Sequence, residues 1–390
     1  MARNEQLDGL VGLSRRYGAD PDWVIAGGGN SSWKSAGRLY VKASGSALGS
    51  IDEDGFCAID RNRLAAIWDK AYPADAEARE AAVLSDLMAA REPGETKRPS
   101  VETLMHGLFP QAWVLHTHPA IVNGLTCGLG GEEAFTRLFS DIAIWVPFVE
   151  PGYLLAKAVR EAAEAFRAKT GGFPSVMFMQ NHGLLVAADD VAGIDRLSDL
   201  VIARLAANLH RRPNATAVAA DARAIERATA KILTRAGAGA AILFRSDAEI
   251  LLRAASPKDF EPLAAAFSPD HIVYAGHEFL RVDDIETLPA AWDGFQRRND
   301  QPPRIVLCRG LGAFSIAMSG GLAAASNAML LFVDACAVAA YTESFGGARH
   351  MSPAMIDFIR HWEVEKYRAK IALGDNASGE AKTCRATHSP

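Results

Sequence analysis

The chain has 390 residues, of which 49% are hydrophobic and 22% charged, and this balance excludes a disordered or fibrous protein. Its net charge is −5 and its 41 basic residues are scattered, so the sequence predicts no nucleic-acid partner and no membrane partner. The five cysteines are far apart, without a Cys-x-x-Cys pair, which is typical of a reducing compartment. The charged first 20 residues lack the apolar core of a signal peptide, so we expect a cytoplasmic protein.

The predicted elements alternate between short strands and helices, which is typical of an α/β or α+β protein. An amphipathic helix is expected within residues 1–20. A glycine-rich loop, 27–32, separates expected strands, and helices then dominate to residue 91. The strands expected in this first part lie at 23–26, 39–43, 56–60, 112–118, 175–179 and 184–187. Pro99 and Ser100 are expected to begin a helix with Ser100 as its N-cap, and two further helices are expected at 153–169 and 191–210.

The stretch after Arg211 is the best candidate for a linker. We therefore expect a first domain at 1–212, a smaller α/β domain at 213–373 and a flexible tail at 374–390. The elements expected in the second domain are strands at 241–244, 304–308 and 313–317 and helices at 322–343 and 353–371. The apolar stretch 322–341 has the length of a membrane span, but Ser326, Asn327 and Asp334 would be costly in lipid, so a buried helix is expected.

His116-Thr117-His118 carries the sharpest local signal for chemistry. Side chains at i and i+2 of a strand project from the same face, so both imidazoles can meet one ion. Imidazole suits zinc and related divalent metals, and a catalytic site needs about three protein ligands. His182, in a turn between two expected strands, is the candidate third ligand. A hydrogen-bonded pair of histidines at the rim of a sheet remains the alternative.

Glu102 lies in the expected first turn of its helix. A carboxylate held there beside a cation can act as a general base, although a first-turn glutamate is also favoured simply by the helix dipole. His106, one turn later, is interpreted as structural. The loop 27–32 together with Lys34 and Lys42 to Ser46 offers backbone N–H groups, hydroxyls and ammonium groups that suit a phosphate; a pair of tight turns explains the same residues.

Five ordered motifs together resemble the class II aldolase/adducin family. They are GGGNSSWK at 27–34, VKASG at 41–45, RPSVETLMH at 98–106, HTHP at 116–119 and QNHGLL at 180–185. The run from residue 98 to 119 is most similar to the aldolase half of bifunctional rhamnulose-1-phosphate aldolase/lactaldehyde dehydrogenase proteins, and the likeness continues at 267–280 and 303–317.

The resemblance implies a three-layer α/β/α fold with a largely antiparallel central sheet, a zinc-type divalent metal and a homo-oligomer, with a tetramer favoured. It implies that His116, His118 and His182 are metal ligands and that Glu102 is the catalytic acid/base. The residues implied or considered for binding substrate phosphate are Gly29, Asn30, Ser31, Lys34, Ser44, Gly45 and Ser100. Val101 stands where sugar-phosphate aldolases of the family often have a second serine, which weakens the phosphate inference. No segment suggests the dehydrogenase half, so lactaldehyde oxidation is not expected.

Three functions are compatible with these residues. The first is an aldolase that cleaves a ketose phosphate or related hydroxy-ketone through a metal-stabilised enediolate. The second is a sugar-phosphate epimerase or oxo-acid phosphate decarboxylase on the same site. The third is a non-catalytic adducin-like binding module. In the second domain, the turns at 268–271 and 310–312 could close over the active site or only support assembly, and the sequence does not decide between these roles.

Overall fold

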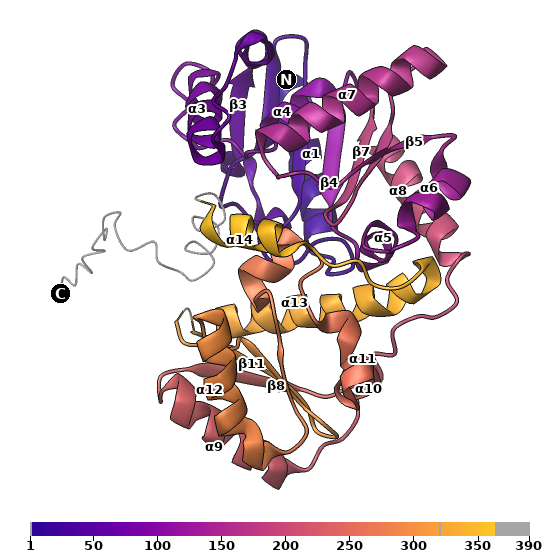
Figure 1. Ribbon diagram of the computed structural model, residues 1–390. Helices are drawn as coiled ribbons and strands as arrows, with labels where there is room; N and C mark the ends of the chain where they lie inside the picture. The colour runs from indigo at the N-terminus through magenta and orange to yellow at the C-terminus, as the bar shows by residue number, and fades with distance from the viewer. Residues whose placement is uncertain (1, 320, 363–390) are drawn as a thin grey trace, which may run out of the picture.

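Two sheets organise the chain in the computed structural model, which describes residues 2–319 and 321–362 (Figure 1). The first is a seven-stranded sheet in the order β3-β2-β1-β4-β7-β6-β5 and the second a four-stranded sheet in the order β8-β11-β10-β9. The first sheet and its helices lie above the second in Figure 1, and the segment 207–221 joins them. We propose the domain boundary in this segment, where residues 212 and 213 lie.

The seven-stranded sheet is largely antiparallel, as the family resemblance implies, and only β5 and β6 pair in parallel. Its strands are β1 (Asn30–Lys34), β2 (Arg38–Lys42), β3 (Phe56–Asp60), β4 (Trp113–Thr117), β5 (Ala143–Val146), β6 (Val176–Met179) and β7 (Gly183–Ala188). Period-2 alternation divides β4 between the two faces, because Trp113 and Leu115 join one apolar cluster and Val114 joins the other.

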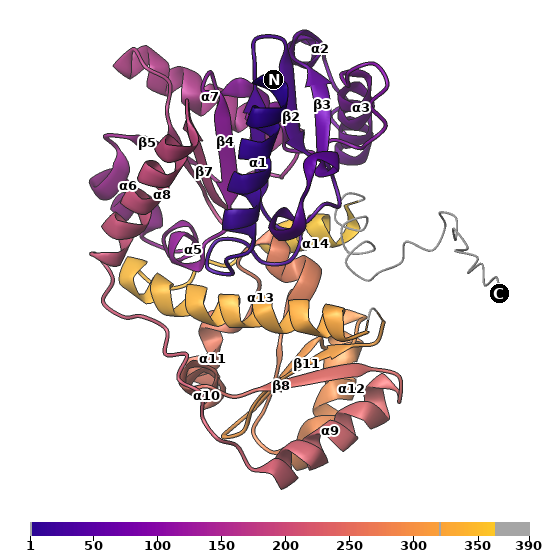
Figure 2. The same ribbon diagram turned by 180° about the vertical axis from the view of Figure 1, so that it is seen from behind.

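Helices cover both faces of this sheet, which makes the first domain a three-layer α/β/α structure (Figures 1 and 2). One face packs against α1 (Ala2–Gly18), α5 (Ala120–Thr126), α6 (Gly131–Phe139) and α8 (Val191–Ala206). The other packs against α2 (Arg61–Ala66), α3 (Ala76–Ala89), α4 (Thr103–Leu108) and α7 (Tyr153–Thr170). In helix α7, Leu155, Ala156 and Val159 form a buried apolar stripe on the face that packs against the sheet. Gly171 ends the helix in a left-handed conformation.

The second domain packs helices against both faces of its smaller sheet. The strands are β8 (Ala241–Arg245), β9 (Leu280–Val282), β10 (Ile305–Cys308) and β11 (Gly312–Ala317). The helices are α9 (Ala222–Ala236), α10 (Ala248–Ala254), α11 (Pro257–Phe260), α12 (Leu288–Asn299), α13 (Gly321–Thr342) and α14 (Pro353–His361). Helices α9 and α12 cover one face through an apolar cluster that includes Ile232 and Trp292, and α13 covers the other through Phe332.

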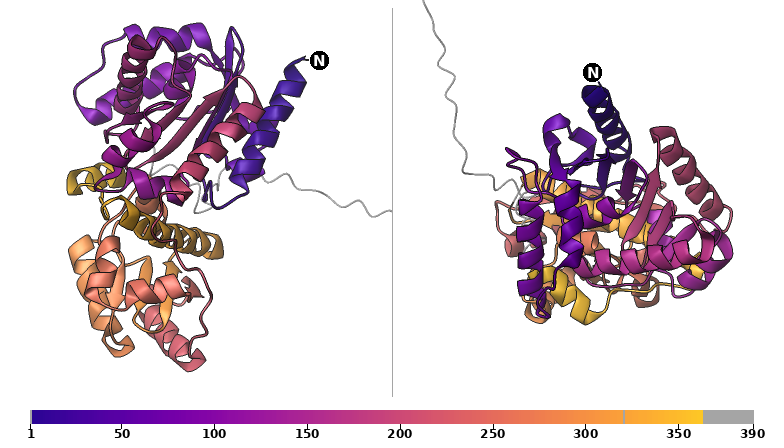
Figure 3. Two further views of the ribbon diagram at one scale, coloured as in Figure 1. Left: turned by 90° about the vertical axis from the view of Figure 1, so that its right-hand side faces the viewer. Right: turned by 90° about the horizontal axis from the view of Figure 1, so that it is seen from above.

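Helix α13 lies at the junction of the two domains, where it packs against α5 and β11 (Figure 3). With the short turn after it, from Gly321 to Phe345, it is long and apolar enough to cross a membrane by length and composition, and half of its most apolar window is buried inside the fold. This position fits the core helix that the sequence predicts.

Several local expectations differ from the structure. Residues 23–26 form turns rather than a strand, and β1 occupies positions expected to be a loop. Its polar side chains are buried at Asn30, Ser31, Ser32 and Lys34, so the apolar alternation that marks a strand is missing. Helix α4 begins at Thr103 with Glu102, not Ser100, at the N-cap position. The expected helix at 353–371 begins as α14; its part after 362 and the tail lie outside the described residues.

Candidate active site

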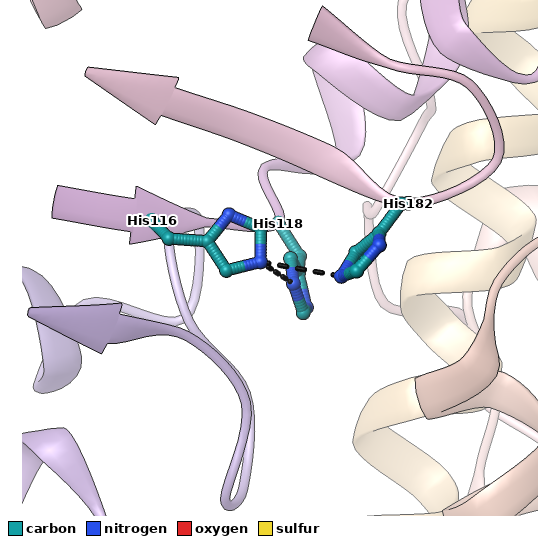
Figure 4. A group of neighbouring side chains, drawn as sticks. All are labelled: His116, His118 and His182. Atoms are coloured by element: carbon teal, nitrogen blue, oxygen red, sulfur yellow. Dashed lines mark hydrogen bonds between the residues drawn. The ribbon is translucent and has the colours of Figure 1, made fainter. Parts of the chain in front are cut away.

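Three histidines converge at the ends of β4, β6 and β7 (Figure 4). His116 lies in β4, His118 follows that strand, and His182 occupies the turn between β6 and β7. The Nε2 atom of His116 lies 2.9 Å from Nε2 of His118 and 3.2 Å from Nε2 of His182. The sequence predicts this set of three, and the structure brings it together.

The turn that carries His182 has a backbone that only certain residues adopt. Asn181 has a φ of 53°, in the left-handed region that asparagine tolerates better than most residues. At Gly183, a Cβ atom would lie 2.5 Å from the carbonyl oxygen of Thr117 and 2.6 Å from Cδ2 of His118. Glycine is therefore required here so that the turn can approach the end of β4 and place His182 beside the other two rings.

The chemistry of these donors fits a divalent cation. Nδ1 of His116 lies 2.8 Å from the carbonyl oxygen of Leu184, and Nδ1 of His118 lies 2.7 Å from Oδ2 of Asp270. Both acceptors require an N–H at Nδ1, so in the neutral rings the Nε2 atoms present lone pairs to each other. A cation between them satisfies these converging lone pairs, and an open set of three imidazoles is typical of catalytic zinc.

Glu102 points at the same centre. Its Oε1 lies 3.2 Å from Nε2 of His116 and 3.6 Å from Nε2 of His182. Its Oε2 accepts a hydrogen bond from Nδ2 of Asn30 at 3.1 Å, and the same amide donates to Oγ of Ser100 at 2.8 Å. The carboxylate is thus fixed by a predicted residue of the glycine-rich segment and is within reach of the ligand nitrogens.

The pKa values of the cluster are perturbed by burial and by mutual contact. Burial raises the pKa of Glu102, but the nearby His116 and His182 outweigh it, so its pKa lies well below the usual range. For His116, burial lowers the pKa, the Glu102 carboxylate raises it, and the net shift is upward. Burial chiefly lowers the pKa of His182 to about 4. Glu102 is therefore ionised and His182 neutral at pH 7, which suits a base and a ligand.

A cavity of about 330 Å³ opens beside this centre. The predicted residues that line it are Gly29, Ser44, Gly45, Ser100, Glu102, His118 and His182. Lys42 also lines it, and its Nζ donates to the carbonyl oxygens of Gly27 and Ser46 at 3.3 and 2.7 Å. Several groups predicted to bind an anion therefore share one cavity with His118 and His182.

Two predicted residues point elsewhere. The Ser31 hydroxyl is buried 2.7 Å from Oγ of Ser14 in α1, and Lys34 is buried with its Nζ donating to the carbonyl oxygen of His106 at 2.9 Å. Neither lines the cavity. His106 is packed against Ser32, with Nδ1 2.7 Å from Oγ, and burial lowers its pKa to about 3, in keeping with a structural role.

The second domain contributes residues that the sequence did not assign to the site. Asp270, Tyr274 and Asn327 line the cavity, and the Tyr274 hydroxyl accepts a hydrogen bond from the N–H of Gly27 at 3.2 Å. The expected turn at 268–271 carries Asp270 into the site, whereas the turn at 310–312 connects β10 and β11 and does not line the cavity. The turn expected at 268–271 is the only local feature of the sequence that points to Asp270.

Comparison with known proteins finds a family model that is similar to the first domain. Residues 9–194, just under half of the chain, match the model described as Class II Aldolase and Adducin N-terminal domain. A curated relative, the uncharacterized oxidoreductase YuxG of Bacillus subtilis (strain 168), is 23% identical over 94% of this chain, and the chain spans 58% of the length of that relative.

Solved structures show likenesses confined to about half of the chain. The N-terminal class II aldolase domain of a conserved protein from Thermoplasma acidophilum is 29% identical, with a TM-score of 0.43 over 52% of this chain and 92% of that chain. An L-fuculose-1-phosphate aldolase from Thermus thermophilus is 12% identical, with a TM-score of 0.33 over 52% of this chain and 93% of that chain. The family match is thus confined to residues 9–194, and the second domain lies outside it.

Proposed function

We propose that the protein is a metal-dependent aldolase that cleaves a hydroxy-ketone, with a ketose phosphate as the first candidate substrate. The observation that carries the proposal is the convergence of three Nε2 atoms and the Glu102 carboxylate at one end of a cavity. The family of the first domain supports aldolase-type chemistry. The resemblance to rhamnulose-1-phosphate aldolases makes that sugar phosphate one substrate to test.

His116, His118 and His182 would hold the divalent ion, for which zinc is the first candidate. When bound, such an ion polarises a carbonyl and stabilises the oxyanion that forms as the carbon–carbon bond breaks. In the synthetic direction the Glu102 carboxylate takes a proton from the carbon next to the carbonyl and passes it to the new hydroxyl oxygen. In cleavage it takes up the proton that the hydroxyl beside the breaking carbon–carbon bond releases, and it delivers that proton to the carbon next to the carbonyl. Asn30 orients that carboxylate by donating to Oε2.

Other polar groups that line the cavity would take the anionic end of the substrate. Ser44, Gly45 and Ser100 line the cavity together with Lys42, and an ammonium beside hydroxyl and backbone groups suits a phosphate. Ser31 and Lys34 are not assigned this role because their side chains are directed away from the cavity, and Asn30 is not assigned it because it does not line the cavity and its amide bonds to Ser100 and Glu102. Phosphate recognition thus rests on fewer groups than the sequence predicts.

The experiment combines metal content with turnover. Purified protein would be analysed for zinc and assayed for aldehyde release from ketose 1-phosphates and the matching free ketoses, with and without added zinc. We expect about one ion per chain in the wild type, its loss in His116→Ala, and its retention in Glu102→Gln with kcat lowered by about 10²-fold or more. Glu133→Gln, which changes an exposed carboxylate on α6, is the matched control and should behave as wild type.

The outcomes separate the candidate functions. Full activity in Glu102→Gln would remove Glu102 from the mechanism. Bound metal without cleavage of any substrate would favour the epimerase or decarboxylase alternative, which uses the same centre. Absence of metal would favour the binding-module alternative. The homo-oligomer, with a tetramer favoured, and the cytoplasmic location stay predictions; light scattering of the purified protein tests the former and fractionation of the source cells the latter.

A further inference from the structure

We propose that Asp270, a residue of the second domain, positions the metal ligand His118, so that the metal centre is built from both domains. The proposal rests on the metal site described above, and it goes beyond the family of the first domain because Asp270 lies outside the matched residues 9–194. Asp270 acts through His118 and is a positioning residue rather than a catalytic one.

The contact between the two side chains is short and protected from water. Oδ2 of Asp270 lies 2.7 Å from Nδ1 of His118, and the side chains are 6% and 15% exposed. A carboxylate can only accept at this distance, so the proton of the neutral ring stays on Nδ1 and the lone pair on Nε2. That lone pair faces His116, whose Nε2 is 2.9 Å away. Asp270 therefore sets both the tautomer and the direction of the ligand atom.

His116 offers an internal comparison. Its Nδ1 donates to a backbone carbonyl, that of Leu184, within the sheet of the first domain. His118 lies beyond the end of β4, where the paired strands no longer supply such a carbonyl, and a charged acceptor from the second domain takes that place. A carboxylate partner raises the basicity of a metal-binding imidazole and restrains its ring.

Contacts within the second domain fix the segment that carries Asp270. The segment from Ser268 to Ala275 includes one turn of π-helix at His271–Ala275. His271 lies between two partners: its Nδ1 is 2.8 Å from Oγ of Ser268, and its Nε2 is 3.0 Å from Oδ2 of Asp334 in α13. Arg304 donates to the carbonyl oxygen of Val273 in the same segment. Asp270 is thus presented by a fixed segment.

Contacts from the first domain complete this support. A Cβ at Gly28 would lie 2.7 Å from Oδ2 of Asp270, so the absence of a side chain there lets the carboxylate reach His118. Asn181, next to His182, donates through Nδ2 to the carbonyl oxygens of Phe267 and Arg349 at 3.0 and 2.9 Å. The turn that carries one ligand is therefore tied to the segment that positions another.

The test measures zinc affinity of the full chain by competition with a chromogenic chelator. We expect Asp270→Ala to weaken zinc binding about 10- to 100-fold and Asp270→Asn, whose amide oxygen can still accept from Nδ1, to weaken it less. Asp293→Asn, a half-exposed carboxylate on α12 paired with Arg235, is the matched control and should bind as wild type. Nitrogen-15 spectra of histidine-labelled, metal-free protein should show His118 losing its Nδ1–H tautomer in Asp270→Ala, a change that loss of packing alone does not produce.

The outcomes distinguish this inference from the proposed function. Wild-type affinity and an unchanged His118 tautomer in Asp270→Ala would overturn the role of Asp270 and leave the aldolase proposal intact. A wild type that binds no zinc, or a His116→Ala variant that binds it equally well, would overturn the metal centre and the inference with it. If Asp270→Ala does not fold by circular dichroism, the zinc affinity of Asp270→Asn decides: a value equal to that of the wild type would overturn the role, because a neutral amide should still weaken binding relative to the carboxylate.

Discussion

Lys34 shows how far burial alone can change the titration of one residue. Its side chain is almost fully buried, and its Nζ donates to the carbonyl oxygen of His106. Burial, with a smaller contribution from Arg61, lowers the pKa of Lys34 to about 7, whereas a lysine in an unfolded chain titrates near ~10.4. Between these values the unfolded chain binds more protons than the folded one, so this lysine makes stability rise with pH from about 7 upward.

Replacing Lys34 with methionine should remove that slope. From pH 7 to 9 we expect the wild type to gain stability relative to Lys34→Met by on the order of 1 kcal/mol per pH unit, with no such relative gain below about pH 6. Urea unfolding of both proteins in the presence of a chelator at pH 5.5, 7.5 and 9 measures this difference in stability. Wild-type and variant stabilities that stay parallel over this range would show that Lys34 titrates normally in the fold.

The histidine ligands illustrate what residue spacing can predict. The strand expected at 112–118 places His116 and His118 on one face by period 2, and a glycine after His182 indicates a turn, so local patterns and the family motifs predict that the three converge. In the structure β4 ends at Thr117 and His118 follows it directly. Asp270 is 152 residues from His118 in the sequence, and an aspartate in a turn carries no local signal of its distant partner. The contact depends on how two domains pack.

At the scale of elements, β1 directs its polar side chains into the packing on either side of the sheet, and none of its residues lines the cavity. Alternation along the strand sends Asn30, Ser32 and Lys34 toward α4, where they meet Glu102 and His106, and sends Ser31 toward α1. The same residues in a loop could all have turned toward a phosphate. Sequence patterns could not distinguish the two cases, since a strand of buried polar residues lacks the apolar period.

Substitutions on β1 and β2 should therefore have different effects on substrate binding. We expect Lys42→Met to raise KM for a phosphorylated substrate about 10-fold or more, because it removes an ammonium that lines the cavity. Ser31→Ala should leave KM within about 2-fold and lower stability by ~1 kcal/mol, because the buried Ser14 hydroxyl loses its hydrogen bond with Ser31 and keeps only the one to the carbonyl oxygen of Leu10. Steady-state kinetics of both variants measures KM, and urea unfolding measures their stability. A larger KM effect from Ser31→Ala than from Lys42→Met would contradict the assignment of the anionic end.

At the scale of the whole molecule, the two domains share a core as well as a site. The cluster around Phe332 of α13 includes Cys127 and packs against Ile25 and Ala120 of the first domain. The chain after α13 also bonds to the first domain through its backbone: N–H groups at 129 and 130 donate to carbonyl oxygens at 347 and 345, and the N–H of Arg349 donates to Cys127. A helix that is apolar over most of its surface is thus covered from two sides.

This shared core predicts that the first domain depends on the second for stability. A fragment of residues 1–212 exposes the face around Ala120 and Cys127, so we expect it to aggregate or to unfold at least 10 °C below the full chain. The control is the full chain with a protease site placed at 215–219, where the side chains are exposed. After cleavage there, the halves should co-elute and keep nearly the original unfolding midpoint, because their contacts are non-covalent. A monomeric fragment with that same midpoint would show two independent domains, and the second would then serve the first only through residues such as Asp270.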